Sequence, residues 1–203
     1  MWEFLTAGGP FMWLLVPTSI VGLTFIIERG LALRWQKVIP LRVQEAVENG
    51  TSERLEELKQ ICEEQPSTLS RLILTAQEHL HQPREENIDV IQTRARREVV
   101  KLERGLVILE IVVGIAPLLG LVGTIHGLIR LFGRLGQAGL GDNAQLAEGI
   151  AIALNTTLMG LLIAIPSLIA WSYYNKKVDT FAVEMETLCD EFLRRQYRGR
   201  KRS

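Results

Sequence analysis

Three long apolar stretches dominate the pattern of hydrophobic and polar positions along this chain. They cover residues 11–27, 105–132 and 148–171. A helix needs roughly 20 apolar residues to cross a bilayer, which the second and third stretches provide and the first nearly provides. Because backbone polar groups in lipid must be satisfied within their own segment, all three stretches are predicted to be transmembrane helices.

The polar parts of the chain also have helical periodicity. No Gly or Pro interrupts residues 84–104, so one continuous helix is expected from about residue 87 into the second apolar stretch, to residue 132. Two shorter helices are expected before it, one that starts near Ser52 and ends at Pro66 and one before Pro83. The third apolar stretch continues into a seam typical of coiled coils, formed by Val178, Phe181, Met185, Leu188 and Phe192.

These patterns predict an all-α membrane protein with three transmembrane helices, in which the second and third spans have long helical extensions on the cytoplasmic side. The expected segments are an N-terminal part with the first span, a cytoplasmic helical region, the second span, a periplasmic connector, the third span and a cytoplasmic helical tail, at 1–35, 36–104, 105–132, 133–147, 148–174 and 175–203. The first span lacks the basic start and the small-residue cleavage site of a signal peptide, so it is expected to be retained.

Charge sets the expected orientation. Basic residues cluster after the first span, before the second and after the third, whereas the amino terminus offers only Glu3. The positive-inside tendency therefore places the amino terminus and the connector outside and the carboxyl terminus in the cytoplasm, although Arg130 and Arg134 weakly oppose this. Basic residues next to a membrane span more often bind anionic lipid or fix the orientation of the chain than bind nucleic acid. No nucleic-acid partner is therefore expected for the basic tail.

Few residues have the chemistry of an active site. Cys62 and Cys189 fall on the reducing cytoplasmic side, so no disulfide is expected. His79 and His81 are two residues apart and would point in nearly opposite directions on a helix, so no metal site is expected. We find no nucleophile with an adjacent base and no phosphate-binding loop, which argues against an enzyme and against a cofactor.

Small residues repeat at helical spacing in the second and third spans. Such residues let membrane helices approach closely, and a tight bundle tolerates the hydrogen bond that a proline removes. Together with the apolar seams, they favour a homo-oligomer over a monomer. The residues assigned to helix packing are Ala116, Pro117, Gly120, Gly123, Gly127, Ala153, Gly160 and Ala164.

Hydroxyl side chains lie at one level of the two later spans. Thr124 is eight residues and Thr157 nine residues from the outer ends of their spans, so both are expected about 12 Å inside the outer boundary. Thr156 and Asn155 adjoin Thr157, and Glu148 lies at the outer mouth. Two interpretations are open: each hydroxyl bonds its own helix at the preceding turn, or the group lines a polar path or a partner contact.

Ionisable residues in the spans are less central. Glu110 lies near the inner end of its span, and His126 is expected to point roughly 200° away from Thr124. Each is either a functional group or a residue that reaches the interface or pairs locally, His126 with Arg130. Because no titratable group of this chain lies at the threonine level, a partner would have to supply the acid that carries a proton there.

Two strings resemble the proton-channel core of the MotA/TolQ/ExbB family: APLLGLVGTIHGLIRLF at 116–132 and GIAIALNTTLMGLLIAIPSLIAW at 149–171. The resemblance implies a multi-pass subunit of the bacterial inner membrane, with a periplasmic amino terminus, that forms a pentamer around a dimeric single-span partner of the ExbD or TolR kind. Proton flow through that complex would energise transport or envelope processes. The family's channel threonines fall on Thr124 and Thr157.

The chain departs from the family pattern at one position. ExbB-like proteins often carry a glutamate in the pattern GIAEAL, whereas this chain has Ile152 there, with Glu148 one helical turn outward on the same face. Whether Glu148 replaces the missing acid is open, and so is the choice between proton and sodium. The alternative interpretation of the whole chain is a membrane scaffold without an ion path.

Overall fold

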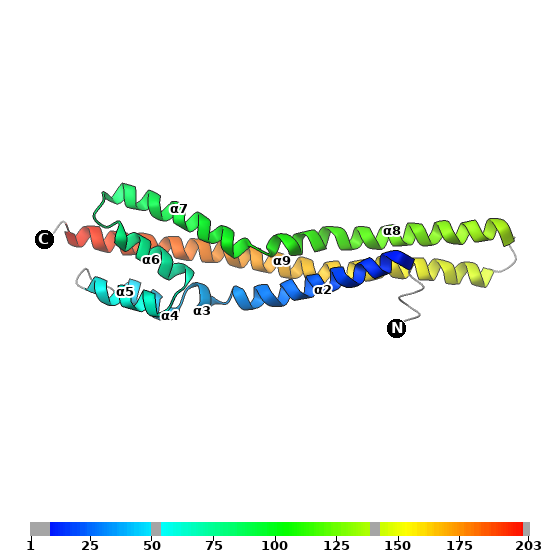
Figure 1. The fold of residues 1–203 in the computed structure, drawn as a ribbon, viewed down its shortest axis with the longest axis horizontal. Helices are drawn as coiled ribbons and strands as arrows, with labels where there is room; N and C mark the ends of the chain where they lie inside the picture. Colours follow the sequence, from blue (N-terminus) through cyan, green and yellow to red (C-terminus); the bar gives the residue numbers. More distant parts are fainter. Residues whose placement is uncertain (1–8, 50–53, 139–142, 201–203) are drawn as a thin grey trace. The chain divides into compact units, whose positions relative to one another are not determined.

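The computed structural model describes residues 9–49, 54–138 and 143–200, and within these ranges the chain is helical, with no strand. Figure 1 labels the helices. In chain order they are α2 (Gly9–Ala32), α3 (Trp35–Val38), α4 (Leu41–Asn49), α5 (Leu55–Glu64), α6 (Thr68–Glu78), α7 (Arg84–Glu103), α8 (Leu106–Ala138) and α9 (Asn143–Arg200).

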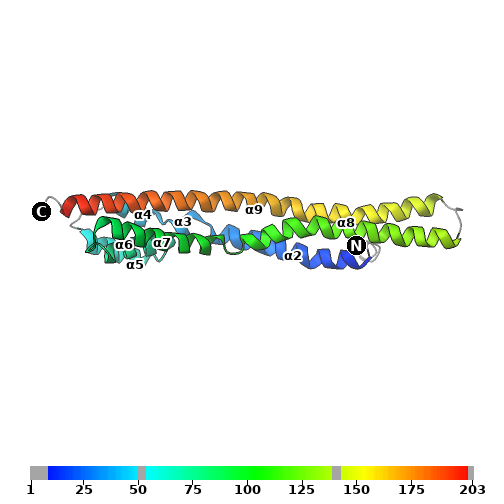
Figure 2. The ribbon, with the colours of Figure 1, turned by 90° about the horizontal axis from the view of Figure 1, so that it is seen from above.

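Three of these helices are long and apolar enough to cross a membrane, which confirms the expected all-α membrane protein. The candidate spans are Pro10–Ala32 in α2, Leu106–Gly133 in α8 and a part of Leu146–Arg198 in α9. Helix α9 continues for 58 residues without interruption, as the unbroken periodicity after the third apolar stretch predicted, and Figure 2 shows its length.

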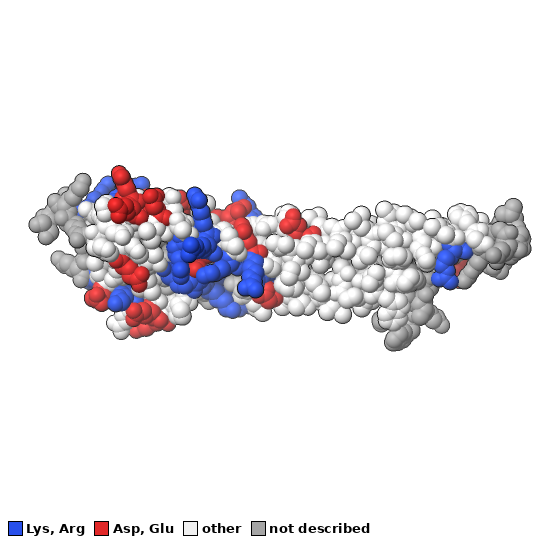
Figure 3. Space-filling model, turned by 45° about the horizontal axis from the view of Figure 1, so that its top comes forward, with Lys and Arg blue, Asp and Glu red and all other residues white. Residues whose placement is uncertain are grey.

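The chain divides into two compact units, which we describe separately. The membrane unit comprises residues 1–29 and 105–173, and the charged unit comprises residues 30–104 and 174–203. On the face drawn in Figure 3, acidic and basic side chains crowd the charged unit, whereas the membrane unit shows almost none. This division follows the hydropathy of the sequence.

Helices α7 and α8 are separate, so the expected continuous helix from residue 87 to residue 132 was wrong. Helix α7 ends at Glu103, Arg104 leaves helical geometry with ψ 124°, and Gly105 has φ +95°. Only glycine adopts such a φ without strain, which makes it a common residue just after a helix end. The apolar periodicity on both sides of Gly105 conceals this break, because periodicity reports burial rather than backbone conformation.

The charged unit has its core along α9. The five seam residues at positions 178, 181, 185, 188 and 192 are at most 2% exposed, as expected. Helix α6 supplies buried leucines. Its N-cap is Ser67, whose hydroxyl accepts a hydrogen bond of 3.0 Å from the Ser70 amide. The short helix predicted before Pro83 is thus confirmed as α6, whereas the predicted start of its predecessor near Ser52 lies outside the described residues.

A buried carboxylate joins α6 to α7. Glu98 is 1% exposed, and its oxygens lie 2.6 Å from Nη2 of Arg71, 2.7 Å from Nζ of Lys101 and 3.6 Å from Nε of Arg94. Burial opposes ionisation of Glu98, but the hydrogen bonds and positive charges of Arg71 and Lys101 outweigh it and hold the pKa of this carboxyl below its ordinary value. Glu98 is therefore an ionised side chain that fixes α7 on α6.

Candidate functional site

The hydroxyls of Thr124 in α8 and Thr157 in α9 are hydrogen-bonded to each other inside the membrane unit. Thr124 is 8% exposed, and its hydroxyl also lies 2.9 Å from the carbonyl oxygen of Ala153 and 3.2 Å from that of Gly120. The Thr157 hydroxyl lies 3.2 Å from the same Gly120 oxygen. Since a hydroxyl carries one proton, each threonine donates to one of these acceptors at a time. The two side chains thus connect α8 to α9, and Thr124 also contacts the preceding turn of its own helix.

Glycines permit the close approach of the two backbones at this level. A Cβ on Gly120 would lie 2.9 Å from both the carbonyl oxygen of Thr156 and the Cα of Thr157. A Cβ on Gly160 would lie 2.5 Å from the carbonyl oxygen of Ala116, and one on Gly127 would lie 3.0 Å from the Cβ of Ala153. Because no side chain separates the backbones, the short threonine hydroxyls reach across.

The other residues assigned to packing occupy the same interface or the contact with α2. Ala116, Ala153 and Ala164 are buried, and Ala116 and Ala164 form an apolar cluster with Met12 and Leu15 of α2. Pro117 is half-buried within α8, which continues past it. The small residues of α8 and α9 therefore face helices of the same chain.

Thr156 and Thr157 are adjacent but face different neighbours. Thr156 packs against Gly123 of α8, where an added Cβ would collide with the Thr156 side chain. The same added Cβ would lie 3.3 Å from the Cβ of Phe11 in α2. Thr156 is 1% exposed, and its hydroxyl has no hydrogen-bond partner among the residues that the structure describes. The structure thus brings Thr157 to Thr124 and turns Thr156 towards α8 and α2.

The remaining polar candidates are not hydrogen-bonded to the threonine pair within the described residues. Asn155 is half-buried, and Glu148 and Glu110 are exposed. The His126 ring packs edge-to-face against Phe11 of α2, with the ring centroids 5.6 Å apart. The hydrogen bonds of Thr124 and Thr157 in the described part of the chain go to hydroxyl and backbone oxygens rather than to a titratable side chain.

The reason given for expecting no metal site at the two histidines was wrong, because both residues follow the end of α6 at Glu78. Their rings are stacked, with the centroids 6.3 Å apart, and so do not point in opposite directions as they would on a helix. Within the described ranges no group of three His, Cys, Asp or Glu residues could hold a metal ion. Cys62 and Cys189 are free and buried, and burial raises the pKa of the Cys62 thiol to about 11.

One close contact of the membrane unit was absent from the sequence analysis. A Cβ on Gly22 of α2 would lie 3.2 Å from Oγ of Ser167 in α9 and 3.2 Å from Cγ1 of Val112 in α8. Ser167 is 2% exposed and donates to the carbonyl oxygen of Ile163 at 2.8 Å. In the sequence, the sign of this contact is a single glycine in the first span, Gly22. It was missed because only small residues repeated at helical spacing were taken to indicate packing.

Comparison with known proteins assigns the helices that hold this site to a protein family. The model of the MotA/TolQ/ExbB proton channel family matches residues 63–187. The chain belongs to this family. The match covers α6, α7, all of α8 and most of α9, including both threonines, and it confirms the resemblance drawn from the two strings at 116–132 and 149–171.

Relatives from three organisms agree with this assignment. The chain is 34% identical over 191 residues to the putative biopolymer transport protein ExbB-like 1 of Synechocystis sp., an alignment that covers 89% of this chain and 74% of the relative. It is 31% identical over 182 residues to the putative biopolymer transport protein ExbB homolog of Methanothermobacter thermautotrophicus, with 87% and 63% covered. It is 36% identical over 96 residues to the Tol-Pal system protein TolQ of Pseudomonas aeruginosa, with 47% and 42% covered.

Proposed function

We propose that this chain is an ExbB/TolQ-like stator subunit that conducts protons across a bacterial inner membrane together with an ExbD/TolR-like single-span partner. The observation that carries the proposal is the Thr124–Thr157 pair, which lies between two helices that match a proton channel family. A pair of hydroxyls that can re-orient, one buried and one half-buried, is suited to contact an acid in either of its protonation states. A hydroxyl donates to a carboxylate and accepts a hydrogen bond from a carboxylic acid.

The partner supplies the proton-carrying group in this mechanism. An aspartate on its helix would be costly in the membrane while ionised, and protonation removes that cost and lets the helix move past apolar neighbours. Thr157 would exchange its bond to Gly120 or Thr124 for one to this carboxyl. One elementary charge that falls through about 100 mV releases about 2.3 kcal/mol, so several protons per cycle are expected for a large movement.

The remaining polar residues of α9 extend the proposed path outwards. Thr156 and Asn155 adjoin the pair, and Glu148 lies exposed one turn beyond Ile152, the position where many ExbB-like proteins have a glutamate. We assign Thr156, Asn155 and Glu148 to the proton path or the partner contact. The unpartnered hydroxyl of Thr156 supports this assignment, because an unpaired buried hydroxyl is costly in an apolar site.

The proposed assembly is a homopentamer in the lipid membrane, with the amino terminus in the periplasm and the carboxyl terminus in the cytoplasm. The distribution of basic residues around the three spans supports this orientation. Large apolar side chains on α8, among them Leu118, Leu121 and Ile125, are 49–60% exposed, which leaves surface for lipid, neighbouring copies and the partner.

Proton uptake by proteoliposomes tests the proposal. The chain and its single-span partner are reconstituted together, a potassium diffusion potential is applied, and internal pH is followed with a fluorescent dye. We expect uptake with both proteins and little with either protein alone. A complex that assembles and conducts neither protons nor sodium would support the scaffold alternative instead.

A further inference from the structure

One face of α7 carries a basic stripe outside the membrane unit. Its residues are spaced three and four apart, which places them on one side of the helix, and they are Arg94, Arg97 and Lys101. Arg104, just after the end of the helix, adds a fourth cation. Arg71 of α6 adds a further cation next to it, and the buried Glu98 supplies a single negative charge. Neither Arg97 nor Arg104 is in an ion pair with another described residue. The stripe therefore has an excess of positive charge on the charged unit, where Figure 3 shows Lys and Arg gathered.

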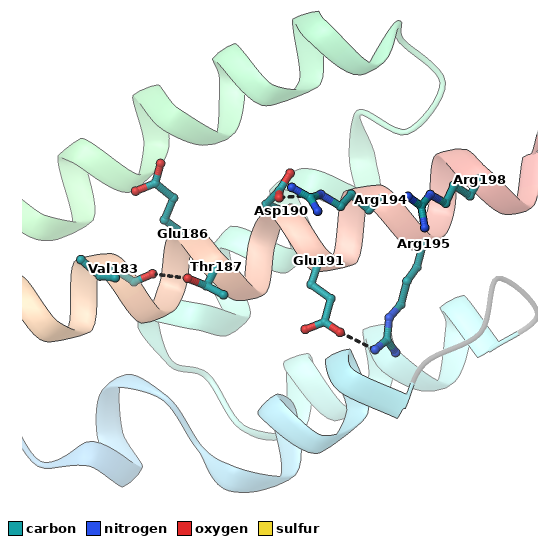
Figure 4. Close-up of a pocket in the computed structure, with 8 residues that line it drawn as sticks. All are labelled: Val183, Glu186, Thr187, Asp190, Glu191, Arg194, Arg195 and Arg198. Carbon is teal, nitrogen blue, oxygen red and sulfur yellow. Dashed lines mark hydrogen bonds and ion pairs between the residues drawn. The ribbon is translucent and has the colours of Figure 1, made fainter.

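An exposed stripe of opposite charge runs along α9 in the same unit. Its members are spaced four, three and four apart, and they are Asp179, Val183, Glu186 and Asp190. The last three line one end of an open trough of about 640 Å³, shown in Figure 4, and Val183 is 64% exposed. Arg194, Arg195 and Arg198 line the other end of this trough, so the acidic character belongs to the end that holds Glu186. Asp190 is paired with Arg84 and Arg194, whereas Asp179 and Glu186 form no ion pair within the described ranges. This α9 stripe thus combines unpaired acids with an uncovered valine.

The two stripes overlap in height along the charged unit. Helices α7 and α9 run side by side in opposite directions, with Arg84 at the start of α7 bonded to Asp190 at 3.1 Å (Figures 1 and 2). An apolar groove of about 590 Å³ between them is lined by residues that include Val99 and Val100 of α7 and Ala182 and Met185 of α9. The basic stripe therefore lies alongside the part of α9 that carries the acids.

We propose that, in the oligomer, the basic stripe on α7 of one copy packs against the α9 stripe of the next copy. Rotation about an axis parallel to these helices keeps each residue at its own height, so the overlap in height allows the same contact around a closed ring. Each copy uses two different surfaces, which is the head-to-tail contact that generates rings. Arg97 and Lys101 meet Asp179 and Glu186, and Val183 is covered. This inference rests on the oligomer of the proposed function and names how its charged units join.

Opposite charge selects the neighbour and the register of this contact. A single exposed ion pair contributes little to the free energy of association, and salt screens its attraction. The contact should therefore weaken as ionic strength rises, whereas the apolar contacts of the membrane unit should persist.

Cross-linking between two differently tagged copies of the full chain tests the contact. One copy carries Arg97→Cys and the other Glu186→Cys; they are co-produced with the partner and treated in membranes with a short bismaleimide. The native thiols Cys62 and Cys189 are buried, so little background is expected. We expect a cross-linked dimer that contains both tags and that decreases in molar salt. Two copies that both carry Arg97→Cys are the control, and a head-to-tail contact predicts little cross-linking between them.

A charge swap separates this inference from the oligomer itself. Arg97→Glu alone and Glu186→Arg alone should each lower the cross-linking of a Lys101→Cys and Val183→Cys pair at least twofold, and the two reversals together should restore it. An intact oligomer in native mass spectrometry without any cross-link would overturn the contact and leave the pentamer standing. A monomer would overturn both. Loss of binding to phosphatidylglycerol vesicles on Arg97→Glu, with cross-linking unchanged, would assign the basic stripe to lipid and also overturn the contact.

Discussion

The hydroxyl of Thr124 in α8 bonds that of Thr157 in α9, at the point where Gly120 brings the two backbones together. This relationship connects the packing of the hairpin to its proposed chemistry. A larger residue at position 120 would separate the helices, and without either hydroxyl the pair could not bind a partner's acid. Packing and proton transfer therefore have to be tested with different substitutions.

Removal of either hydroxyl should impair proton flow while leaving assembly intact. Thr124→Val and Thr157→Val keep the size of the side chain and remove its hydrogen bond. Loss of a bond to an ionisable group corresponds to about a tenfold or larger fall in partner-dependent proton uptake. The double variant should be little worse than the poorer single variant, because groups that act as one unit are not additive.

Thr24→Val is the matched control for this experiment. Thr24 lies exposed on α2 and donates to the carbonyl oxygen of Ile20 in its own helix at 2.7 Å. Its replacement should leave proton uptake nearly unchanged. Full activity of both core valine variants would show that the threonines only pack helices.

A second prediction concerns the close approach of α8 and α9. Gly160→Ala places a methyl group 2.5 Å from the backbone oxygen of Ala116, which only a shift of the helices can relieve. Overpacking of this kind costs about 1–3 kcal/mol, so the melting temperature in detergent should fall by several degrees. Gly114→Ala is the control, because nothing lies within 4 Å of its added Cβ. Equal melting temperatures for the two variants would contradict the close contact.

Much of this fold could be predicted because membrane helices follow from hydropathy and buried faces from periodicity. That Thr124 and Thr157 lie at one level of the two helices followed from helical rise alone, and the seam along α9 needed only spacing. The break at Gly105 was not predictable in the same way, because one left-handed residue leaves the apolar pattern unchanged. Glu98 was also missed, since its burial depends on Arg71, which is 27 positions away in the chain.

A third prediction concerns orientation. A thiol introduced by Asn143→Cys, at the start of α9, should react with a membrane-impermeant maleimide added to spheroplasts, whereas one introduced by Glu45→Cys in α4 should react only after lysis. Glu45 is exposed, so protection of its replacement would reflect the membrane and not burial. The reverse pattern would invert the proposed orientation and the direction of proton entry.

The last prediction concerns pH and the ion cluster of the charged unit. The pKa of Glu98 is lowered from its ordinary value of 4.5, so folding favours its ionised form. The resulting stabilisation is fully present above about pH 4.5, the value expected for the unfolded chain, and is lost as pH falls through the lower pKa of the folded state. As Glu98 takes up a proton, its bonds to Arg71 and Lys101 weaken.

Glu98→Gln should therefore destabilise the charged unit at neutral pH by about 1–3 kcal/mol, because it removes the negative charge from three cations and leaves them buried in part. The difference from the wild type should shrink as pH falls from 4.5 through the lower pKa of the folded state, because the wild-type carboxyl takes up a proton there. Thermal unfolding can be followed by tryptophan fluorescence, since the partly exposed Trp35 packs against the buried ring of Phe181 with centroids 5.2 Å apart. Glu85→Gln, at an exposed position of the same helix, is the control and should leave the pH profile unchanged. A Glu98→Gln profile parallel to the wild type at every pH would mean that Glu98 is not ionised in the folded protein.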